Sequence, residues 1–164
     1  MYGNLTQWYA EDMTLYKEWG QVHKSQINFM VITPDRQYLF TQSSDGYLNQ
    51  WDISSGECVF NYGKANVGSA HSMAITPCSE FLFTTGDKIP LRQWSIDMNE
   101  IYCDFYDGFN DQIKCMTIAP KGEFLFMGGE NSSLIEWSIS KQKILKKYPK
   151  LGIGAINCLV FFYF

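Results

Sequence analysis

The stretch that decides the fold is "DGYLNQWDI", residues 45–53. It opens with the turn pair Asp45-Gly46, continues as a strand-like run, and carries Trp51 followed by Asp52. Tryptophan recurs at this phase with a constant spacing of 43 residues, at Trp8, Trp51, Trp94 and Trp137. Repeats of about 40–45 residues are typical of architectures in which one supersecondary unit stacks on the next.

Proline and phenylalanine columns keep the same interval of 43 residues. Proline stands at Pro34, Pro77 and Pro120, and phenylalanine at Phe40, Phe83 and Phe126. Each of these phenylalanines follows a leucine. Because no insertion or deletion interrupts the register, the sequence predicts consecutive copies of one structural unit.

Each repeat is predicted to contain four short strands. In the first full repeat these are residues 26–32, 37–43, 47–53 and 57–62, separated by turn-forming residues. In the turn Thr33-Pro34-Asp35, proline fixes φ and aspartate bonds its own backbone. Strands of about six residues with turns every 8–12 residues indicate an all-β fold. No segment holds the apolar stripe of an amphipathic helix for three turns.

These residues resemble the Trp-Asp (WD) repeat β-propeller family, and the resemblance covers nearly the whole chain. Its best match is residues 23–53, where His23 stands before the first strand, Asp45 stands at the turn and Trp51-Asp52 is the family's dipeptide. The resemblance implies an all-β fold of propeller blades with four antiparallel strands each. We expect three full blades plus partial blades at both termini.

The repeat boundaries imply a single propeller segment over residues 1–164. It consists of a partial blade (1–20), three blades (21–63, 64–106 and 107–149) and a second partial blade (150–164). Four full repeats would be longer than the chain, which leaves three alternatives. The chain is a segment of a larger propeller, a small four-bladed ring with one depleted blade, or one member of a ring assembled from several chains. The first is our expectation, and the third implies self-association to complete the ring.

The resemblance also implies that His23, Ser43, Asp45 and Trp51 form one buried hydrogen-bonded network. A buried indole N–H needs an acceptor, and a hydroxyl can accept from it and donate onward to the imidazole. Thr41 lies on the same strand face as Ser43 and is the alternative hydroxyl. The competing interpretation is a hydrolase triad of His, Ser and Asp. The sequence shows no nucleophile elbow or oxyanion loop, so we expect no catalysis.

The later repeats lack parts of this pattern, because the turn aspartate at Asp45 becomes Lys88 and then Asn131. We therefore expect Trp94 and Trp137 to be held mainly by packing. The first full blade is expected to be the best anchored part of the chain.

Two sets of residues are candidates for binding other proteins or peptides. The first is a polar column in otherwise apolar first strands, which the resemblance places along the central channel: Asn28, His71 and Lys114. This column is either solvated lining or a ring that contacts a peptide or ligand. The second set lies in the loops before the first strands and in the turns between second and third strands: Lys24, Ser44, Lys88, Phe109 and Asn110. Phe109 is either an interaction anchor or local packing.

The fourth strands of the last two blades carry charges of opposite sign. Residues 95–113 contain five acids and no basic residue, and residues 138–164 contain five lysines and no acid. By phase, Asp104 aligns with Lys147. Charged outer strands protect a sheet edge against stray pairing, and a basic docking patch for an acidic partner is the alternative.

Composition limits the classes of function. A net charge of −4 and a pI of about 5.1 disfavour general affinity for nucleic acid or for an anionic membrane. The five cysteines are scattered without metal or redox spacing, which predicts reduced thiols and a cytoplasmic protein. The two histidines have no ligand-like spacing, so we expect no metal site and no cofactor.

The sequence as a whole predicts a non-catalytic protein–protein interaction scaffold built from WD repeats, within a larger propeller or assembly. The alternative is a small-ligand or modified-peptide binding module that uses the central channel. Fold alone does not decide between them, because one fold hosts many functions.

Overall fold

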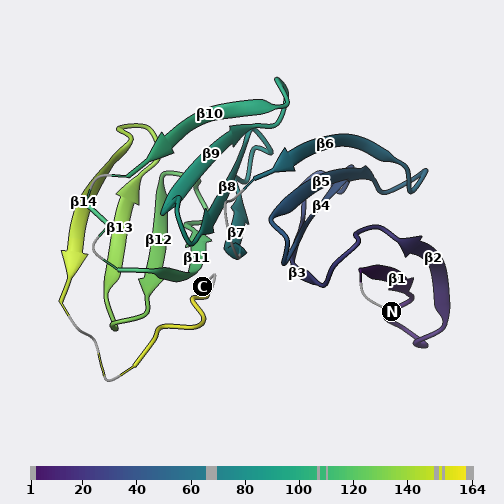
Figure 1. Ribbon diagram of the computed structural model, residues 1–164, viewed down its shortest axis with the longest axis horizontal. Helices are drawn as coiled ribbons and strands as arrows, with labels where there is room; N and C mark the ends of the chain where they lie inside the picture. The colour runs from purple at the N-terminus through teal and green to yellow at the C-terminus, as the bar shows by residue number, and fades with distance from the viewer. Residues whose placement is uncertain are drawn as a thin grey trace.

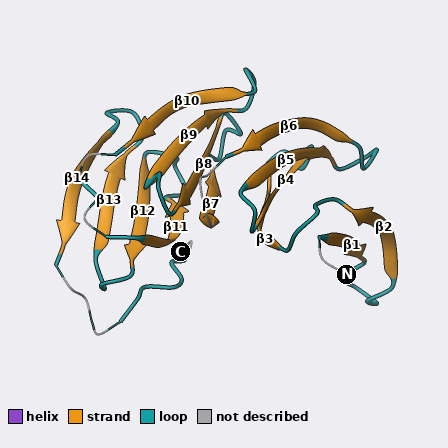
Figure 2. Ribbon diagram, in the orientation of Figure 1, coloured by secondary structure: helices purple, strands orange, loops and turns teal. Residues whose placement is uncertain are grey.

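The computed structural model describes residues 3–65, 70–106, 108–109, 111–149, 152 and 154–161. The described residues form β-strands and no helix (Figure 2). The prediction of an all-β fold is confirmed. Strands β1 (Asn4–Trp8) and β2 (Leu15–Gln21) pair antiparallel as a two-stranded sheet. Within this part of the chain, no helix has the length and apolar character needed to cross a membrane.

Three four-stranded antiparallel sheets follow, one per repeat, and we call them blades 1, 2 and 3. Blade 1 consists of β3 (Ile27–Ile32), β4 (Tyr38–Ser43), β5 (Tyr47–Asp52) and β6 (Cys58–Lys64). Blade 2 consists of β7 (Ala70–Ile75), β8 (Phe81–Gly86), β9 (Leu91–Ser95) and β10 (Glu100–Phe105). Blade 3 consists of β11 (Ile113–Ile118), β12 (Phe124–Gly129), β13 (Leu134–Ser138) and β14 (Lys143–Tyr148).

The blades stack along an arc (Figure 1). The first strands lie on the inner side of the arc, where β7 contacts both β3 and β11. The fourth strands, β6, β10 and β14, lie on the outer side. Strand order follows the sequence across each sheet, which is the predicted arrangement of four-stranded propeller blades.

The C-terminal segment lies against blade 3 but forms no strand in its described residues, 152 and 154–161. Ile156 N donates to Gly129 O (3.0 Å), and the Phe161 ring packs edge-on against Phe126 with centroids 5.2 Å apart. The described residues of the second partial blade, expected over residues 150–164, therefore form no strand.

The hydrophobic core lies between consecutive blades rather than inside one. One cluster joins Phe40 and Leu48 of blade 1 to Leu82 and Trp94 of blade 2. A second joins blades 2 and 3, and a third joins the β1–β2 pair to Leu39 and other residues of blade 1. The neighbours Leu39 and Phe40 therefore pack towards opposite sides of β4. Consecutive apolar residues are the pattern of a strand that is covered on both faces.

One aromatic contact repeats at every described blade boundary. The pairs, with the distances between ring centroids, are Trp19–Trp51 (6.4 Å), Tyr62–Trp94 (5.3 Å) and Phe105–Trp137 (4.6 Å). The aromatic residue of each fourth strand thus covers the repeat tryptophan of the next unit. The three covering aromatic residues are spaced by 43 residues, and so are the three tryptophans that they cover. The same interface between neighbouring units therefore occurs three times.

In blades 1 and 3 the aromatic residue at this fourth-strand position is a tyrosine that also makes a hydrogen bond. The Tyr62 hydroxyl donates to Gln50 Oε1 (2.9 Å), and the Tyr148 hydroxyl donates to Glu136 Oε2 (3.0 Å). Both pairs join the fourth strand to the third strand of the same blade. In blade 1 the bond gives the buried Gln50 side chain a partner, which avoids the cost of an unpaired group.

Phe105→Tyr should raise the free energy of unfolding by about 0.5–1.5 kcal/mol, the net value of one hydrogen bond. Phe105 occupies the position of Tyr62 in blade 2, and the buried Gln93 Oε1 beside it has no hydrogen-bond partner among the described residues. The new hydroxyl would supply the missing donor. Urea unfolding followed by circular dichroism measures the change. Phe81→Tyr, at another half-buried ring of blade 2, is the control and should bring no gain; a less stable Phe105→Tyr protein contradicts the prediction.

Candidate functional site

The loops before the first strands and the turns between second and third strands lie at one end of the blades, because antiparallel strands return there at every second connection. Backbone bonds hold them together. Ser44 N donates to Gln26 O (2.8 Å) in blade 1, and Glu130 N donates to Gln112 O (2.9 Å) in blade 3. We call this end the loop face; its described residues are 22–26, 44–46, 86–90, 108–109, 111–112 and 129–133.

A hydrogen-bonded network in blade 1 links the third strand to the loop face. Trp51 Nε1 donates to Thr41 Oγ1 (2.8 Å), and this hydroxyl lies 2.7 Å from His23 Nε2. Ser43 donates to the Asp45 carboxylate instead. Of the two hydroxyls that the sequence left open, Thr41 is the one that joins the indole to the imidazole.

The side chains of the alternative His–Ser–Asp triad are not ordered for catalysis. His23 Nε2 meets Thr41, while Ser43 meets Asp45, so these bonds do not place the imidazole between the serine and the carboxylate. The Ser43 side chain is also buried, which leaves its hydroxyl closed to a substrate. The bonds instead fasten the loop before β3 onto β4 and β5.

Blade 2 retains the threonine of this network. Trp94 Nε1 donates to Thr84 Oγ1 (3.0 Å), so this core ring, which we expected to be held mainly by packing, also makes a hydrogen bond. In blade 3 the threonine position holds Met127. There the buried Trp137 Nε1 has no hydrogen-bond partner in the described part of the chain. Blade 3 therefore holds its tryptophan by packing.

Blade 3 fixes its loop face through Asp111. Its Oδ2 accepts from Asn131 N (2.9 Å) and from the Ser133 hydroxyl (2.6 Å), and its Oδ1 accepts from Asn131 Nδ2 (2.9 Å). Burial acts to raise the pKa of Asp111, but these hydrogen bonds outweigh it and hold the pKa below its ordinary value. Two repeats earlier, Ser25 Oγ accepts from Asp45 N (3.3 Å). The sequence did not reveal this shared role in fixing the loop, because the equivalent position holds serine in one repeat and aspartate in another.

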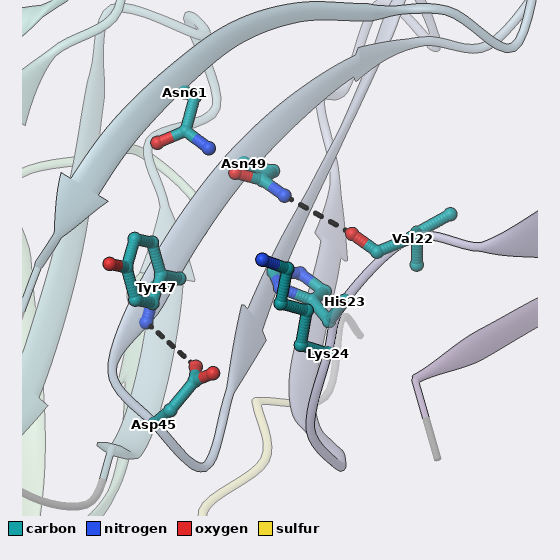
Figure 3. Close-up of a pocket in the computed structure, with 7 residues that line it drawn as sticks. All are labelled: Val22, His23, Lys24, Asp45, Tyr47, Asn49 and Asn61. Atoms are coloured by element: carbon teal, nitrogen blue, oxygen red, sulfur yellow. Dashed lines mark hydrogen bonds between the residues drawn. The ribbon is translucent and has the colours of Figure 1, made fainter. Parts of the chain in front are cut away.

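A cleft of ≈ 300 Å³ opens on the loop face of blade 1 (Figure 3). Its lining residues are Val22, His23, Lys24, Asp45, Tyr47, Asn49 and Asn61. Asn49 Nδ2 donates to Val22 O (3.3 Å), while the buried Asn49 Oδ1 has no hydrogen-bond partner among the described residues. Burial acts to raise the pKa of Asp45, but hydrogen bonds from Ser43 and Tyr47 hold it below its ordinary value. The cleft therefore offers a carboxylate, an ammonium group and an unused amide oxygen.

The polar column of the first strands lies at a register shift that recurs in every blade. Asn28, His71 and Lys114 each stand where the pairing with the second strand skips one residue. Such a bulge re-aims a side chain out of the regular alternation. The side chains of His71 and Lys114 are half-buried in one cluster, whereas Asn28 is exposed on blade 1.

That cluster bridges blades 2 and 3 at the loop face. His71 Nε2 lies 2.7 Å from Asp87 Oδ1, and Gln112 Nε2 donates to the same oxygen (2.9 Å). Lys114 Nζ donates to Gln112 Oε1 (2.5 Å) and lies 3.7 Å from Glu130 Oε1. Within the described residues, no three His, Cys, Asp or Glu side chains are grouped to hold a metal ion. The cluster is therefore a hydrogen-bonded bridge with two exposed carboxylates at its ends.

A known family model matches residues 16–52: WD40, "WD domain, G-beta repeat". The matched range runs from β2 to the end of β5 and contains the Trp51–Thr41–His23 network. Residues 16–52 are thus a WD40 repeat. The family prediction made from the residues is confirmed.

Two solved structures share the WD40 fold of this chain. The WD40 repeats of RRP9 match with a TM-score of 0.69 at 20% identity, over 76% of this chain and 39% of that one. U3-55K matches with a TM-score of 0.69 at 19% identity, over 77% of this chain and 40% of that one. This chain thus spans about two fifths of the length of those chains. A search of curated protein sequences found no match.

The other predicted binding residues of this chain lie apart from one another. Lys24 and Ser44 are exposed on blade 1, and Lys88 is exposed on blade 2. Phe109 is half-buried and stacks on Trp137, with ring centroids 5.9 Å apart and an interplanar angle of 28°. The Phe109 ring therefore belongs partly to the core, and it also lines a second loop-face cleft with Asp87, Asp111 and Gln112. Asn110 lies outside the described residues.

The stability of this WD40 fold should fall as the pH drops below 6.5, through the titration of His23. Burial lowers the pKa of His23 from 6.5, and the nearby Asp45 carboxylate offsets only part of this. As the pH falls, His23 therefore binds a proton in the unfolded chain at a higher pH than in the folded chain. The His23 contribution is therefore complete above pH 6.5 and is lost as the pH falls through the folded-state pKa.

Urea midpoints of wild type and His23→Gln across this range test the pH prediction. The variant should lose the His23 part of the slope, even though it is less stable at every pH. Identical slopes in the two proteins would contradict a buried neutral imidazole.

Proposed function

We propose that this WD40-repeat protein is a non-catalytic scaffold that binds other proteins or peptides through its loop face. The observation that carries the proposal is the blade 1 cleft. Its floor holds the buried Asn49 amide with an unused oxygen, and its rim holds the exposed residues Lys24 and Asp45. A buried acceptor without a partner carries a desolvation cost, which a ligand N–H would remove.

The groups of this cleft suit a polar peptide. A backbone or side-chain N–H of the peptide would donate to Asn49 Oδ1. An acidic side chain would meet Lys24, and a basic one would meet Asp45. The Trp51–Thr41–His23 network holds the loop before β3 in place, so little order would have to be created on binding.

Partner capture with paired charge variants tests the scaffold proposal. Lys24→Glu combined with Lys88→Glu reverses two exposed charges on the loop face and should weaken capture of a loop-face partner by tenfold or more. Lys121→Glu combined with Lys141→Glu makes the same change in turns at the opposite end of the blades and is the matched control. Equal loss with both pairs, or no loss with either, counts against a loop-face site.

A second candidate function is the binding of a small ligand or a modified peptide in the channel. The observation that favours it is the His71–Asp87–Gln112–Lys114–Glu130 cluster, which reaches the inner side of the arc. Here His71→Ala combined with Lys114→Ala should abolish binding, while the loop-face charge pair should retain it. The two variant pairs therefore separate the two functions.

We further propose that the blades belong to a larger ring or assembly and that copies of this chain associate with one another. Trp8, the repeat tryptophan of the β1–β2 pair, is 54% exposed, which supports association at that end of the arc.

A further inference from the structure

We propose that strand β14 of one chain docks on the β1–β2 pair of a second copy, with Tyr148 packed against Trp8 and Lys146 beside Asp12. This inference deepens the proposed self-association and rests on it, but it does not depend on loop-face binding. Strand β14 and the β1–β2 pair lie at opposite ends of the arc (Figure 1). The chain already makes an equivalent contact within itself, between β2 and blade 1.

Strand β2 shows how the contact is made. Trp19 packs edge-on against Trp51 of blade 1. Lys17 Nζ lies 5.0 Å from the ring centroid of Trp19 and donates to Ser55 O (2.7 Å) in the turn between β5 and β6. An aromatic residue and the lysine two positions before it thus attach β2, which stands at the fourth-strand position, to the following blade.

Strand β14 carries the same pair three repeats later. Lys146 Nζ lies 4.4 Å from the ring centroid of Tyr148, as Lys17 lies over Trp19. The Tyr148 hydroxyl donates to Glu136 Oε2 (3.0 Å), which holds the ring in place. The three earlier fourth-strand aromatic residues each contact a tryptophan ring, whereas no tryptophan among the described residues packs on Tyr148. Blade 3 therefore presents a preformed docking pair on its outer strand.

The β1–β2 pair carries the matching aromatic position. Trp8 stands 43 residues before Trp51 and is 54% exposed, whereas the three later repeat tryptophans are between 2% and 9% exposed. Each of those three is covered by an aromatic residue from the preceding unit. Covering Trp8 in the same way would bury a large apolar ring, which is the kind of residue that dominates interface energies.

The turn between β1 and β2 also matches the turn that receives Lys17. In blade 1, Gly56 N donates to Asp52 O (2.8 Å), and Asp52 N donates to Glu57 O (3.0 Å). The same bonds join Met13 N to Tyr9 O (3.0 Å) and Tyr9 N to Thr14 O (2.9 Å). Asp12 therefore occupies the backbone position of Ser55, where the docking lysine of the preceding unit arrives.

Charge complementarity identifies a second copy as the occupant. Asp12 is exposed, and hydrogen bonds from the Thr14 N–H and hydroxyl lower its pKa, so it is ionised at neutral pH. Glu11 lies beside it, while Lys146 is flanked by Lys143 and Lys147 on β14. Each chain thus carries both halves of the contact at the right phase. The two halves are different surfaces, so the contact is head-to-tail.

Light scattering on the purified full chain tests the proposal. Wild type should show a concentration-dependent mass above the 18.9 kDa of one chain. Trp8→Ser and Tyr148→Ser should each lower the association constant by tenfold or more. Asp12→Lys should also weaken association, and Lys146→Asp in the same chain should restore it. Tyr102→Ser removes an aromatic residue of comparable exposure from β10 and should leave association unchanged.

Mixing the two single variants gives the sharpest outcome. The Trp8→Ser chain retains Tyr148, and the Tyr148→Ser chain retains Trp8, so a one-to-one mixture should form a dimer through one intact contact. Circular dichroism establishes that each variant is folded. A monomeric wild type, association that ignores both variants, or a mixture that stays monomeric overturns the proposal. None of these results bears on loop-face capture, which is measured separately with the lysine variants.

Discussion

Trp51→Ala should lower the free energy of unfolding by about 3–5 kcal/mol, the usual cost of deleting a buried aromatic side chain. The Trp51 ring is 9% exposed, packs against Trp19 and belongs to the cluster that joins the β1–β2 pair to blade 1. The substitution also removes the indole donor from Thr41, which joins the ring to His23. Urea unfolding followed by far-ultraviolet circular dichroism measures the loss.

Paired phenylalanine variants separate the hydrogen bond of Trp51 from its packing. Trp51→Phe and Trp137→Phe both retain an aromatic ring and remove an indole N–H. In blade 1 the N–H donates to Thr41, but in blade 3 it has no partner among the described residues. Trp51→Phe should therefore cost about 1 kcal/mol more than Trp137→Phe. Equal costs would mean that the bond to Thr41 adds nothing to stability.

The fold could be predicted because the core between blades requires a recognisable pattern of consecutive apolar residues in the sequence. Leu39 and Phe40 pack towards different neighbours, so burial on both sides of β4 makes consecutive residues apolar. The repeat of this pattern without insertions then aligned every blade. The described C-terminal residues did not form the expected strand, because apolar residues alone do not supply a backbone ladder.

The network was harder to predict because a column shows residue types rather than distances. Leu39 pairs with Trp51 across β4 and β5, so Thr41 is the diagonal neighbour of the indole and Ser43 lies two residues further along. Diagonal neighbours are within reach of an aromatic side chain. The hairpin register therefore decides between the two hydroxyls. The same column holds Thr84 and then Met127, which was the available signal that blade 2 retains the bond and blade 3 does not.

Register also explains why the phase of the charges did not reveal their partners. By phase Asp104 aligns with Lys147, but the pairing of β9 and β10 places Asp104 opposite Arg92. A register shift between Ile101 and Cys103 sets this pairing, and no residue pattern announces it. The acidic residue that sequence analysis assigned to edge protection is thus the partner of a buried arginine.

Asp104→Ala should lower the free energy of unfolding by about 3–5 kcal/mol, the cost of removing one partner of a buried ion pair. Arg92 is buried and donates to both carboxylate oxygens, from Nε to Oδ1 (2.5 Å) and from Nη2 to Oδ2 (2.6 Å). Its Nη1 donates to Ala65 O of blade 1 (2.6 Å), and its guanidinium lies 5.3 Å from the Trp94 ring. Without Asp104 the guanidinium keeps its place but loses its counter-charge. Urea unfolding of the variant measures the loss.

Two further variants show whether the uncompensated charge causes that loss. Glu100→Gln removes an exposed charge from the same strand and should change stability by no more than about 0.5 kcal/mol. Arg92→Met combined with Asp104→Ala removes both charges, and it should be more stable than Asp104→Ala alone because no buried charge is left unpaired. If the double variant is the less stable of the two, the bonds from Arg92 to Ala65 and its packing on Trp94 matter more than the ion pair. Arg92 would then act chiefly as the link between blades 1 and 2.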